Sequence, residues 1–304
     1  MSKLAIIFPG QGSQYVGMGK DLIDNNPTAR ELYQQADDIL GFSLSKICSE
    51  GPEAELRQTK NTQPAIFLHS AVLLHLLKNI NGNFTAGHSL GEYTSLFFGK
   101  SLKFEDALKL VRLRGELMQK AGEEQPGTLA AVVGLEPNIV KQICLEAAEE
   151  GLVQCANFNS PGQIVISGSM PGVRKAMTLA KEKGAKMVKE LVVSGAFHSP
   201  LMESAQQGLI HGLISSNIAD AKIPVYTNVS AKPITTANEI RQSLQSQLTS
   251  AVLWDDSIRN MINDGADTFI EIGPGKVLQG LIKRINPDVK TFGIDKYNDL
   301  EQLP

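Results

Sequence analysis

The sequence contains little cysteine, no long apolar run and no strong excess of charge. Its 304 residues include only three cysteines, Cys48, Cys144 and Cys155, which form neither a C-x-x-C pair nor a cluster with histidines at metal-ligand spacing. An odd and scattered set of cysteines argues against a disulfide framework and against a zinc site. We therefore expect buried, reduced thiols and no metal.

No pattern in the sequence predicts a targeting or membrane-spanning segment. Met1-Ser2-Lys3 runs directly into the short apolar run Leu4–Phe8 without a signal-peptide pattern, and no apolar stretch is long enough to cross a bilayer. A formal net charge of -3, with no dense basic run, gives no pull toward nucleic acid or an anionic membrane. We expect a cytoplasmic protein whose partners are neither nucleic acids nor membranes.

The sequence does have the composition and alternation of an α/β protein. With 42% hydrophobic and 20% charged residues, the chain can bury a large core. The apolar run Leu4–Phe8 ends at Pro9-Gly10, and a second short strand, Thr85–Gly87, precedes a helical pattern. This alternation predicts a large α/β domain.

A second pattern interrupts the first in the middle of the chain. Its elements follow the order of a split βαβ unit, which predicts an inserted ferredoxin-like α+β subdomain. We expect strand Thr128–Leu135, helix Pro137–Glu150, strands Val153–Asn157 and Gln163–Ser167, helix Pro171–Lys183 and strand Ala185–Val193. The predicted domains are residues 1–126 and 195–304 for the large part and residues 127–194 for the insert.

Gly87-His88-Ser89-Leu90-Gly91 has the G-x-S-x-G pattern of a nucleophile elbow. In such a sharp strand-to-helix turn, the glycines let the serine adopt a strained backbone and expose its hydroxyl. A short strand before the pattern and a helical pattern after it fit this interpretation. A glycine-rich connection with an incidental serine is the alternative, and the five residues alone leave both open.

A serine nucleophile needs a nearby imidazole as its base, and the sequence offers five histidines. Four have plainer roles, because they lie on helical patterns or should point away from the adjacent serine: His69, His75, His211 and His88. His198 differs because it precedes Ser199-Pro200, a serine N-cap with proline at the first helical position. The positive end of a helix dipole would keep this ring neutral. A histidine that only caps or packs a helix is the alternative.

Arg114 lies in the middle of the apolar stripe of a helical pattern over Phe104–Ala121. A guanidinium there needs an anionic partner, either a structural carboxylate or a substrate carboxylate held bidentately. Gly115 beside it would allow a close backbone approach. Arg112, in contrast, lies on the polar face, where ion pairs four residues apart explain it.

Two further turns are rich in glycine. Pro9–Gln14 follows the first strand but fails the G-x-G-x-x-G pattern of dinucleotide loops, because position 15 is a tyrosine. Such a loop can supply one backbone N–H of an oxyanion hole, with the amide of Leu90 as the second. Gly273-Pro274-Gly275-Lys276 is interpreted as ordinary turn chemistry.

These segments together resemble the malonyl-CoA:acyl carrier protein transacylase family of bacterial fatty acid synthesis, from about Leu4 to Ile285. The matching stretches, in the family's order, are Phe8–Gln14 (FPGQGSQ), Thr62–Ala65 (TQPA), Ala86–Tyr93 (AGHSLGEY), Arg114–Gln119 (RGELMQ), Asn157–Gly168 (NFNSPGQIVISG), Gly195–Met202 (GAFHSPLM) and Glu271–Leu278 (EIGPGKVL). The resemblance implies an α/β-hydrolase-like large domain with a nucleophile elbow and the ferredoxin-like insert.

The resemblance also implies roles for individual residues. Ser89 takes the malonyl group, His198 acts first as base and then as acid, and Arg114 binds the free carboxylate. The backbone amides of Gln11 and Leu90 form the oxyanion hole.

Three further positions follow from the same resemblance. The main-chain carbonyl of Gln247 takes the place of the acid in the usual triad. Phe197 and Gln63 line the substrate pocket, where the ring of Phe197 crowds an α-methyl group.

The implied reaction is ping-pong, with malonyl-CoA as donor, coenzyme A as leaving group and the phosphopantetheine thiol of acyl carrier protein as acceptor. It requires no metal or redox cofactor, and we expect a monomer. An acidic carrier could be steered by basic side chains near the cleft, or these could be plain surface charges: Lys186, Lys189, Lys283 and Arg284.

Two other functions compete with acyl transfer. A serine esterase or thioesterase would share the elbow, but in those hydrolases the histidine comes last in the chain, whereas more than a hundred residues follow His198. A neutral ester would also leave Arg114 unexplained. A non-catalytic module that only docks carrier proteins should have lost Ser89, His198 or Arg114, and all three are present.

Overall fold

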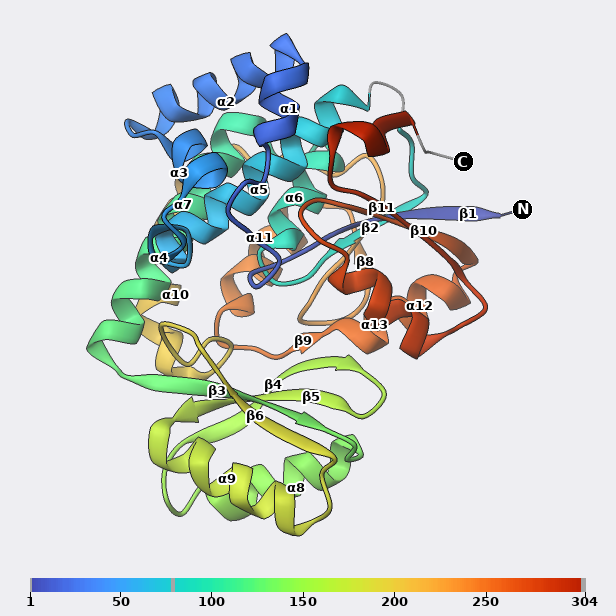
Figure 1. The fold of residues 1–304 in the computed structure, drawn as a ribbon. Coiled ribbons are helices and arrows are strands. Elements are labelled where there is room, and N and C mark those ends of the chain that lie inside the picture. The colour runs from blue at the N-terminus through green and yellow to red at the C-terminus, as the bar shows by residue number, and fades with distance from the viewer. Residues whose placement is uncertain (1, 78–79, 302–304) are drawn as a thin grey trace.

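The structure is a computed structural model that describes residues 2–77 and 80–301. A large α/β part and a smaller α+β part lie one against the other (Figure 1). The helices are α1 Lys20–Asn25, α2 Pro27–Leu40, α3 Leu44–Glu50, α4 Glu53–Leu56, α5 Thr59–Leu76, α6 Gly91–Phe98, α7 Phe104–Glu124, α8 Pro137–Ala147, α9 Met170–Glu182, α10 Glu203–Ser215, α11 Ala237–Gln247, α12 Trp254–Asn263 and α13 Val277–Ile285, with short 3-10 helices at Pro200–Met202 and Tyr297–Glu301. The strands are β1 Lys3–Phe8, β2 Phe84–Gly87, β3 Gly127–Val133, β4 Val153–Ser160, β5 Gln163–Ser169, β6 Met187–Leu191, β7 Val225–Tyr226, β8 Pro233–Ile234, β9 Val252–Leu253, β10 Ala266–Ile272 and β11 Lys290–Ile294.

The large sheet has the strand order β11-β10-β1-β2-β7-β8 and is parallel except for β8. Central strand β1 is buried on both faces: Ile6 and Phe8 join the core that includes α5 and α6, and Ala5 and Ile7 join the core with α12 and α13. Burial on both faces explains why the sequence of this strand is continuously apolar and does not alternate between apolar and polar residues. The parallel order places the carboxyl ends of β1 and β2 side by side, where the site is found.

The small sheet has the order β6-β3-β5-β4-β9, and its first four strands are antiparallel. Helices α8 and α9 cover its outer face (Figure 1) and pack their apolar stripes on it. All six elements predicted for this segment are present in the predicted order, with ends shifted by a few residues. The fold is therefore an α/β-hydrolase-like large part with a ferredoxin-like insertion.

One strand of the small sheet was not predicted. β9, which comes from far along the chain, pairs in parallel with β4, matching Asn157 to Val252 and Phe158 to Leu253. The small sheet is thus completed by the C-terminal part of the chain. This pairing fixes the segment just before β9 against the insert.

The three cysteines are free, with Cys48 and Cys144 buried and Cys155 partly exposed. In residues 2–77 and 80–301, no helix combines the length and apolarity needed to cross a bilayer. Over the same residues, no group of three or more His, Cys, Asp or Glu side chains could hold a metal ion.

Candidate active site

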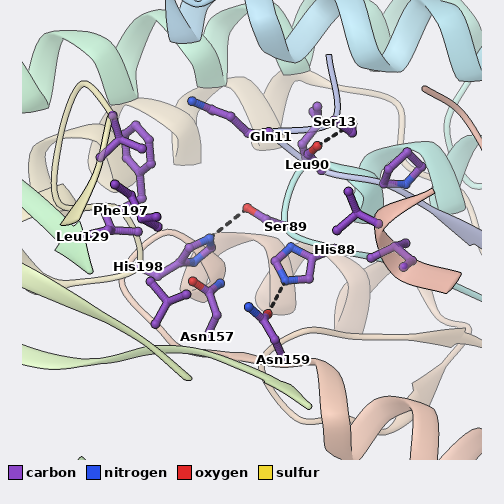
Figure 2. A pocket seen from close by; sticks show the side chains of 18 of the residues that line it. Gln11, Ser13, His88, Ser89, Leu90, Leu129, Asn157, Asn159, Phe197 and His198 are labelled. Atoms are coloured by element: carbon purple, nitrogen blue, oxygen red, sulfur yellow. Dashed lines mark hydrogen bonds between the residues drawn. The ribbon is translucent and has the colours of Figure 1, made fainter. Parts of the chain in front are cut away.

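A cavity of about 250 Å³ lies where the carboxyl ends of β1 and β2 face the small sheet. Its walls come from the loop after β1, the turn after β2, helices α5, α7 and α13, and strands β3 to β6. Figure 2 shows Ser89, His198, His88 and Phe197 around this space. Segments that are far apart in the sequence therefore meet at one site.

Ser89 sits at the sharp turn between β2 and α6, as the G-x-S-x-G pattern predicts. Its φ of 52° lies in the left-handed region, which is strained for a residue with a side chain. The flanking glycines are needed for close packing: a Cβ on Gly87 would overlap the backbone of Gly91, and one on Gly91 would overlap the carbonyl of Phe8. The turn is held tightly against β1 and presents the hydroxyl to the cavity.

His198 meets Ser89 directly, with 2.8 Å between Nε2 and the serine Oγ (Figure 2). On the other side of the ring, Nδ1 lies 3.0 Å from the carbonyl oxygen of Gln247 and 3.1 Å from that of Ser250. Carbonyl oxygens only accept hydrogen bonds, so Nδ1 must carry the proton and Nε2 is left to accept from Ser89. The Ser250 carbonyl is a second orienting group that the sequence did not reveal.

The environment of His198 favours the neutral ring. Burial, and after it the nearby guanidinium of Arg114, lower the pKa of His198 to about 3. The sequence predicted a neutral ring from a helix dipole, and Ser199 does cap the following turn by accepting from the amide of Leu201. That turn is a 3-10 helix of only three residues, Pro200–Met202, so desolvation and Arg114 are the causes instead.

Arg114 is fully buried on α7, with its guanidinium beside the serine. Nη1 donates to Oε1 of Gln63 at 2.8 Å, and Nη2 donates to Oε1 of Gln247 at 3.0 Å and to Oγ of Ser89 at 3.1 Å. All three acceptors are neutral, and no carboxylate in the described parts of the chain is paired with this cation. The structural ion pair that the sequence left open is therefore not found.

The neighbours of Arg114 on α7 pack the helix and pair charges on its surface. A Cβ on Gly115 would come within 2.7 Å of the carbonyl oxygen of Thr59, so this glycine allows α7 to pack on α5 and does not bring backbone to a substrate. Arg112 pairs with Glu116 at 2.6 Å, as predicted, and its Nη1 also donates to the carbonyl of Lys60 and to Oδ1 of Asn61 on α5. Of these positions on the helix, Arg114 is therefore the one that serves the cavity.

The backbone amides of Gln11 and Leu90 belong to segments that line the cavity on the same side as Ser89. Within residues 2–77 and 80–301, neither amide donates a hydrogen bond to another group. The side chain of Gln11 is tied back by a 3.3 Å bond from Nε2 to Oγ1 of Thr59. Two unpaired backbone N–H donors near a nucleophile are the groups that typically form an oxyanion hole.

His88 was expected to point away from the serine, and its side chain is indeed bonded to another residue. Its ring lines the same cavity, but Nε2 lies 2.8 Å from Oδ1 of Asn159 (Figure 2), and the hydroxyl of Ser89 is bonded to His198 instead. Burial lowers the pKa of His88. Asn159 lies on β4, so this hydrogen bond connects the small sheet to the ring of His88. The ring is thus part of the cavity wall.

Phe197 also lines the cavity, and it is almost wholly buried. The basic residues proposed to steer a carrier do not line it. Lys283 donates to the carbonyls of Pro287 and Val289 at the end of α13, and Arg284 donates to Gln163. These contacts favour a structural role for both side chains.

Several residues at the site carried no clear signal in the sequence. Glu92 and Asn159 lie inside matching stretches without an assigned role, and Asn228 and Gln154 lie outside every such stretch. Asn228 accepts the backbone N–H of Ser89 at 2.6 Å, and Gln154 donates to the carbonyl of His198 at 2.9 Å. The role of such polar residues can be seen only from the groups that they contact in the folded structure.

The comparisons with known proteins agree with this geometry. Residues 5–291 match the family described as acyl transferase domain. The chain belongs to this acyl transferase family. The malonyl CoA-acyl carrier protein transacylase of Bacillus subtilis (strain 168) is 47% identical to this acyl transferase over 304 residues, covering 99% of the chain and 96% of the relative.

Solved structures of other acyl transferases match the fold over the whole chain. The acyl carrier protein S-malonyltransferase of Vibrio cholerae has a TM-score of 0.95 at 38% identity and covers 100% of both chains. A malonyl-transacylase solved in complex with a type II PKS acyl-carrier protein has a TM-score of 0.96 at 36% identity, covering 99% of this chain and 98% of that one.

Proposed function

We propose that this acyl transferase moves the malonyl group of malonyl-CoA to the phosphopantetheine thiol of acyl carrier protein, through an ester on Ser89, and so supplies fatty acid synthesis. The observation that carries this proposal is the buried guanidinium of Arg114, whose Nη2 lies 3.1 Å from Oγ of Ser89 and whose acceptors are all neutral. An acyl group on that oxygen which itself bears a carboxylate would give the guanidinium an anionic hydrogen-bond partner, which it lacks among its acceptors in the described residues. The names of the relatives support the same reaction.

In the first half-reaction, Oγ of Ser89 attacks the thioester carbonyl while its proton passes to Nε2 of His198. The carbonyls of Gln247 and Ser250 hold the Nδ1 proton in place and stabilise the imidazolium that forms. The amides of Gln11 and Leu90 receive the oxyanion. The carbon–sulfur bond then breaks, and coenzyme A leaves with the proton from His198.

The second half-reaction reverses these steps with a different thiol. His198 removes the proton from the phosphopantetheine thiol, the sulfur attacks the malonyl ester, and the proton returns to Oγ of Ser89 as the ester bond breaks. Arg114 and Gln63 hold the malonyl carboxylate throughout, and Phe197 closes the pocket against a larger acyl group.

We further propose that the enzyme acts in the cytoplasm and that it is a monomer. Sedimentation at working concentration would test the oligomeric state.

The test is intact-mass spectrometry of the protein mixed briefly with malonyl-CoA and then with a thiol-bearing carrier protein. We expect a malonyl adduct on the wild type that disappears when the carrier is added, and no adduct on Ser89→Ala. An adduct that is lost to water at the same rate without the carrier would indicate a hydrolase. No adduct on the wild type would overturn the proposal.

A further inference from the structure

The reaction proposed above makes no use of Glu92, a fully buried carboxylate in the first turn of α6, three residues after the nucleophile. Its Oε2 accepts from the backbone N–H of Asn228 and from Nε2 of Gln247, each at 2.9 Å, and its Oε1 accepts from Oγ of Ser243 at 3.3 Å. Every partner acts as a donor, which suits an ionised carboxylate that only accepts. Burial raises the pKa of Glu92, and these donors, with Arg114, act in the opposite direction.

The first connection to the active site runs through the side chain of Gln247. Its Nε2 donates to Glu92 and, at 3.1 Å, to the carbonyl of Ser89, so both amide hydrogens are used. The amide oxygen is thereby turned toward Nη2 of Arg114 at 3.0 Å. A flipped amide would set its NH₂ against the guanidinium, donor against donor.

The second connection runs through Asn228. With its backbone N–H held by Glu92, its Oδ1 accepts the N–H of Ser89 at 2.6 Å and its Nδ2 donates to the carbonyl of Gly87 at 2.7 Å. These two bonds hold the elbow on both sides of His88. The left-handed φ of Ser89 is the strained geometry that they support.

We propose that Glu92 is a positioning residue for the malonyl transfer: through Gln247 it orients Arg114 toward the substrate carboxylate, and through Asn228 it holds the backbone of Ser89. This role rests on the proposed function. Because the Gln247 connection leads to the group that distinguishes malonyl from acetyl, loss of Glu92 should lower the preference for malonyl and not merely the overall rate.

Two variants separate positioning from folding. Glu92→Met has a similar length but leaves the Asn228 N–H and the Gln247 amide without an acceptor. Glu92→Gln can keep one oxygen on the side where both donors converge, with its NH₂ facing the hydroxyl of Ser243. Thr94→Val is the matched control, because Thr94 lies on the same helix, is fully buried and has a hydroxyl without a hydrogen-bond partner.

The measurement is the rate of Ser89 ester formation with malonyl-CoA and with acetyl-CoA in a single turnover, with thermal unfolding followed for each variant. We expect Glu92→Met to lower the malonyl-to-acetyl rate ratio by roughly tenfold or more, as for a misplaced charged hydrogen bond. Glu92→Gln should restore the ratio to within about threefold of the wild type, and Thr94→Val should leave it unchanged. If Glu92→Met does not fold, Glu92→Asp, which withdraws the carboxylate by one methylene, should lower the same ratio.

An unchanged ratio in a folded Glu92→Met protein would overturn the proposal, because a purely structural residue slows both substrates alike. A Glu92→Gln protein with the low ratio of the methionine variant would also overturn it, since charge and not hydrogen bonding would then matter. The wild type separates this result from the proposed function: absence of a malonyl ester on the wild type overturns both, whereas a normal wild type confines the failure to Glu92.

Discussion

At the scale of single residues, the site depends on burying a cation and an imidazole side by side. Arg114 is held by neutral oxygens and lowers the pKa of the nearby His198, whose ring is already desolvated. Each group therefore makes a separate and measurable contribution. Arg114 determines the choice of substrate, and His198 determines the pH range of the reaction.

Arg114→Ala should lose malonyl transfer relative to acetyl transfer. A charged hydrogen bond is worth about 1.5–3 kcal/mol, so the ratio should fall roughly 10- to 150-fold. Single-turnover rates with malonyl-CoA and acetyl-CoA give the ratio. Lys109→Ala, at an exposed ion pair on the same helix, is the control, and an equal loss in both variants would contradict the assigned role.

The pH dependence of ester formation should reflect the lowered pKa of His198. A pKa of about 3 means that the ring stays unprotonated, and able to act as base, far below the usual pKa of histidine. The rate of the first half-reaction should therefore stay nearly constant from about pH 8 to about pH 5, where an unperturbed histidine would lose roughly 30-fold. A decline centred near pH 6.5 in stopped-flow or quenched reactions would show that the ring is not desolvated in solution.

At the scale of elements, the elbow can form because β1, β2 and α6 approach one another more closely than they could if Gly87 and Gly91 carried a Cβ atom. Gly91 lies against the carbonyl of Phe8, and Gly87 lies against Gly91. Gly280 in α13 is the opposite case, because a Cβ there would meet nothing within 4 Å. The two kinds of glycine should respond in opposite ways to the same substitution.

Gly91→Ala should destabilise the protein by about 3 kcal/mol or more, because backbone atoms cannot move aside as a flexible side chain can. Gly280→Ala should instead raise the free energy of unfolding by about 0.5–1 kcal/mol, since alanine restricts the unfolded chain and suits a helix interior. Chemical denaturation measures both changes, and ester formation should be retained only in Gly280→Ala. A stable, active Gly91→Ala protein would contradict the tight elbow.

At the scale of the whole molecule, the site lies between two sheets that must keep their relative position. Gln154 on β4 of the small sheet donates to the carbonyl of His198, and β9 pairs with the same strand. Because β9 directly follows the segment whose carbonyls hold the imidazole, the insert helps to aim the base.

Gln154→Leu should therefore slow transfer without changing the preference for malonyl. Loss of one neutral hydrogen bond, worth about 1 kcal/mol, predicts a rate roughly fivefold lower with both malonyl-CoA and acetyl-CoA. Gln142→Leu, on the exposed face of α8, should behave as the wild type. A change in the malonyl-to-acetyl ratio would show that Gln154 acts on the substrate pocket instead.

The sequence alone was enough to predict the fold class, the order of elements in the insert, the elbow at Ser89 and the placement of Arg114 on the apolar stripe of α7. These features depend on neighbours in the chain: glycine spacing sets a turn, and apolar periodicity sets a buried face. Elimination among the five histidines selected His198, and family resemblance added Gln247; the contact between these two residues is present in the structure. The boundaries of residues 127–194 as a domain stay a prediction.

Only the tertiary structure decided the remaining polar contacts of the site. The second carbonyl at His198, the position of His88 in the cavity wall, the Glu92 network and the pairing of β9 with β4 all join residues far apart in the chain. A buried hydrogen bond needs a partner at the correct distance and angle, and local sequence carries no information on either. The chain's local patterns therefore determined where the reactive groups stand on their elements, and packing of the two sheets determined what each group touches.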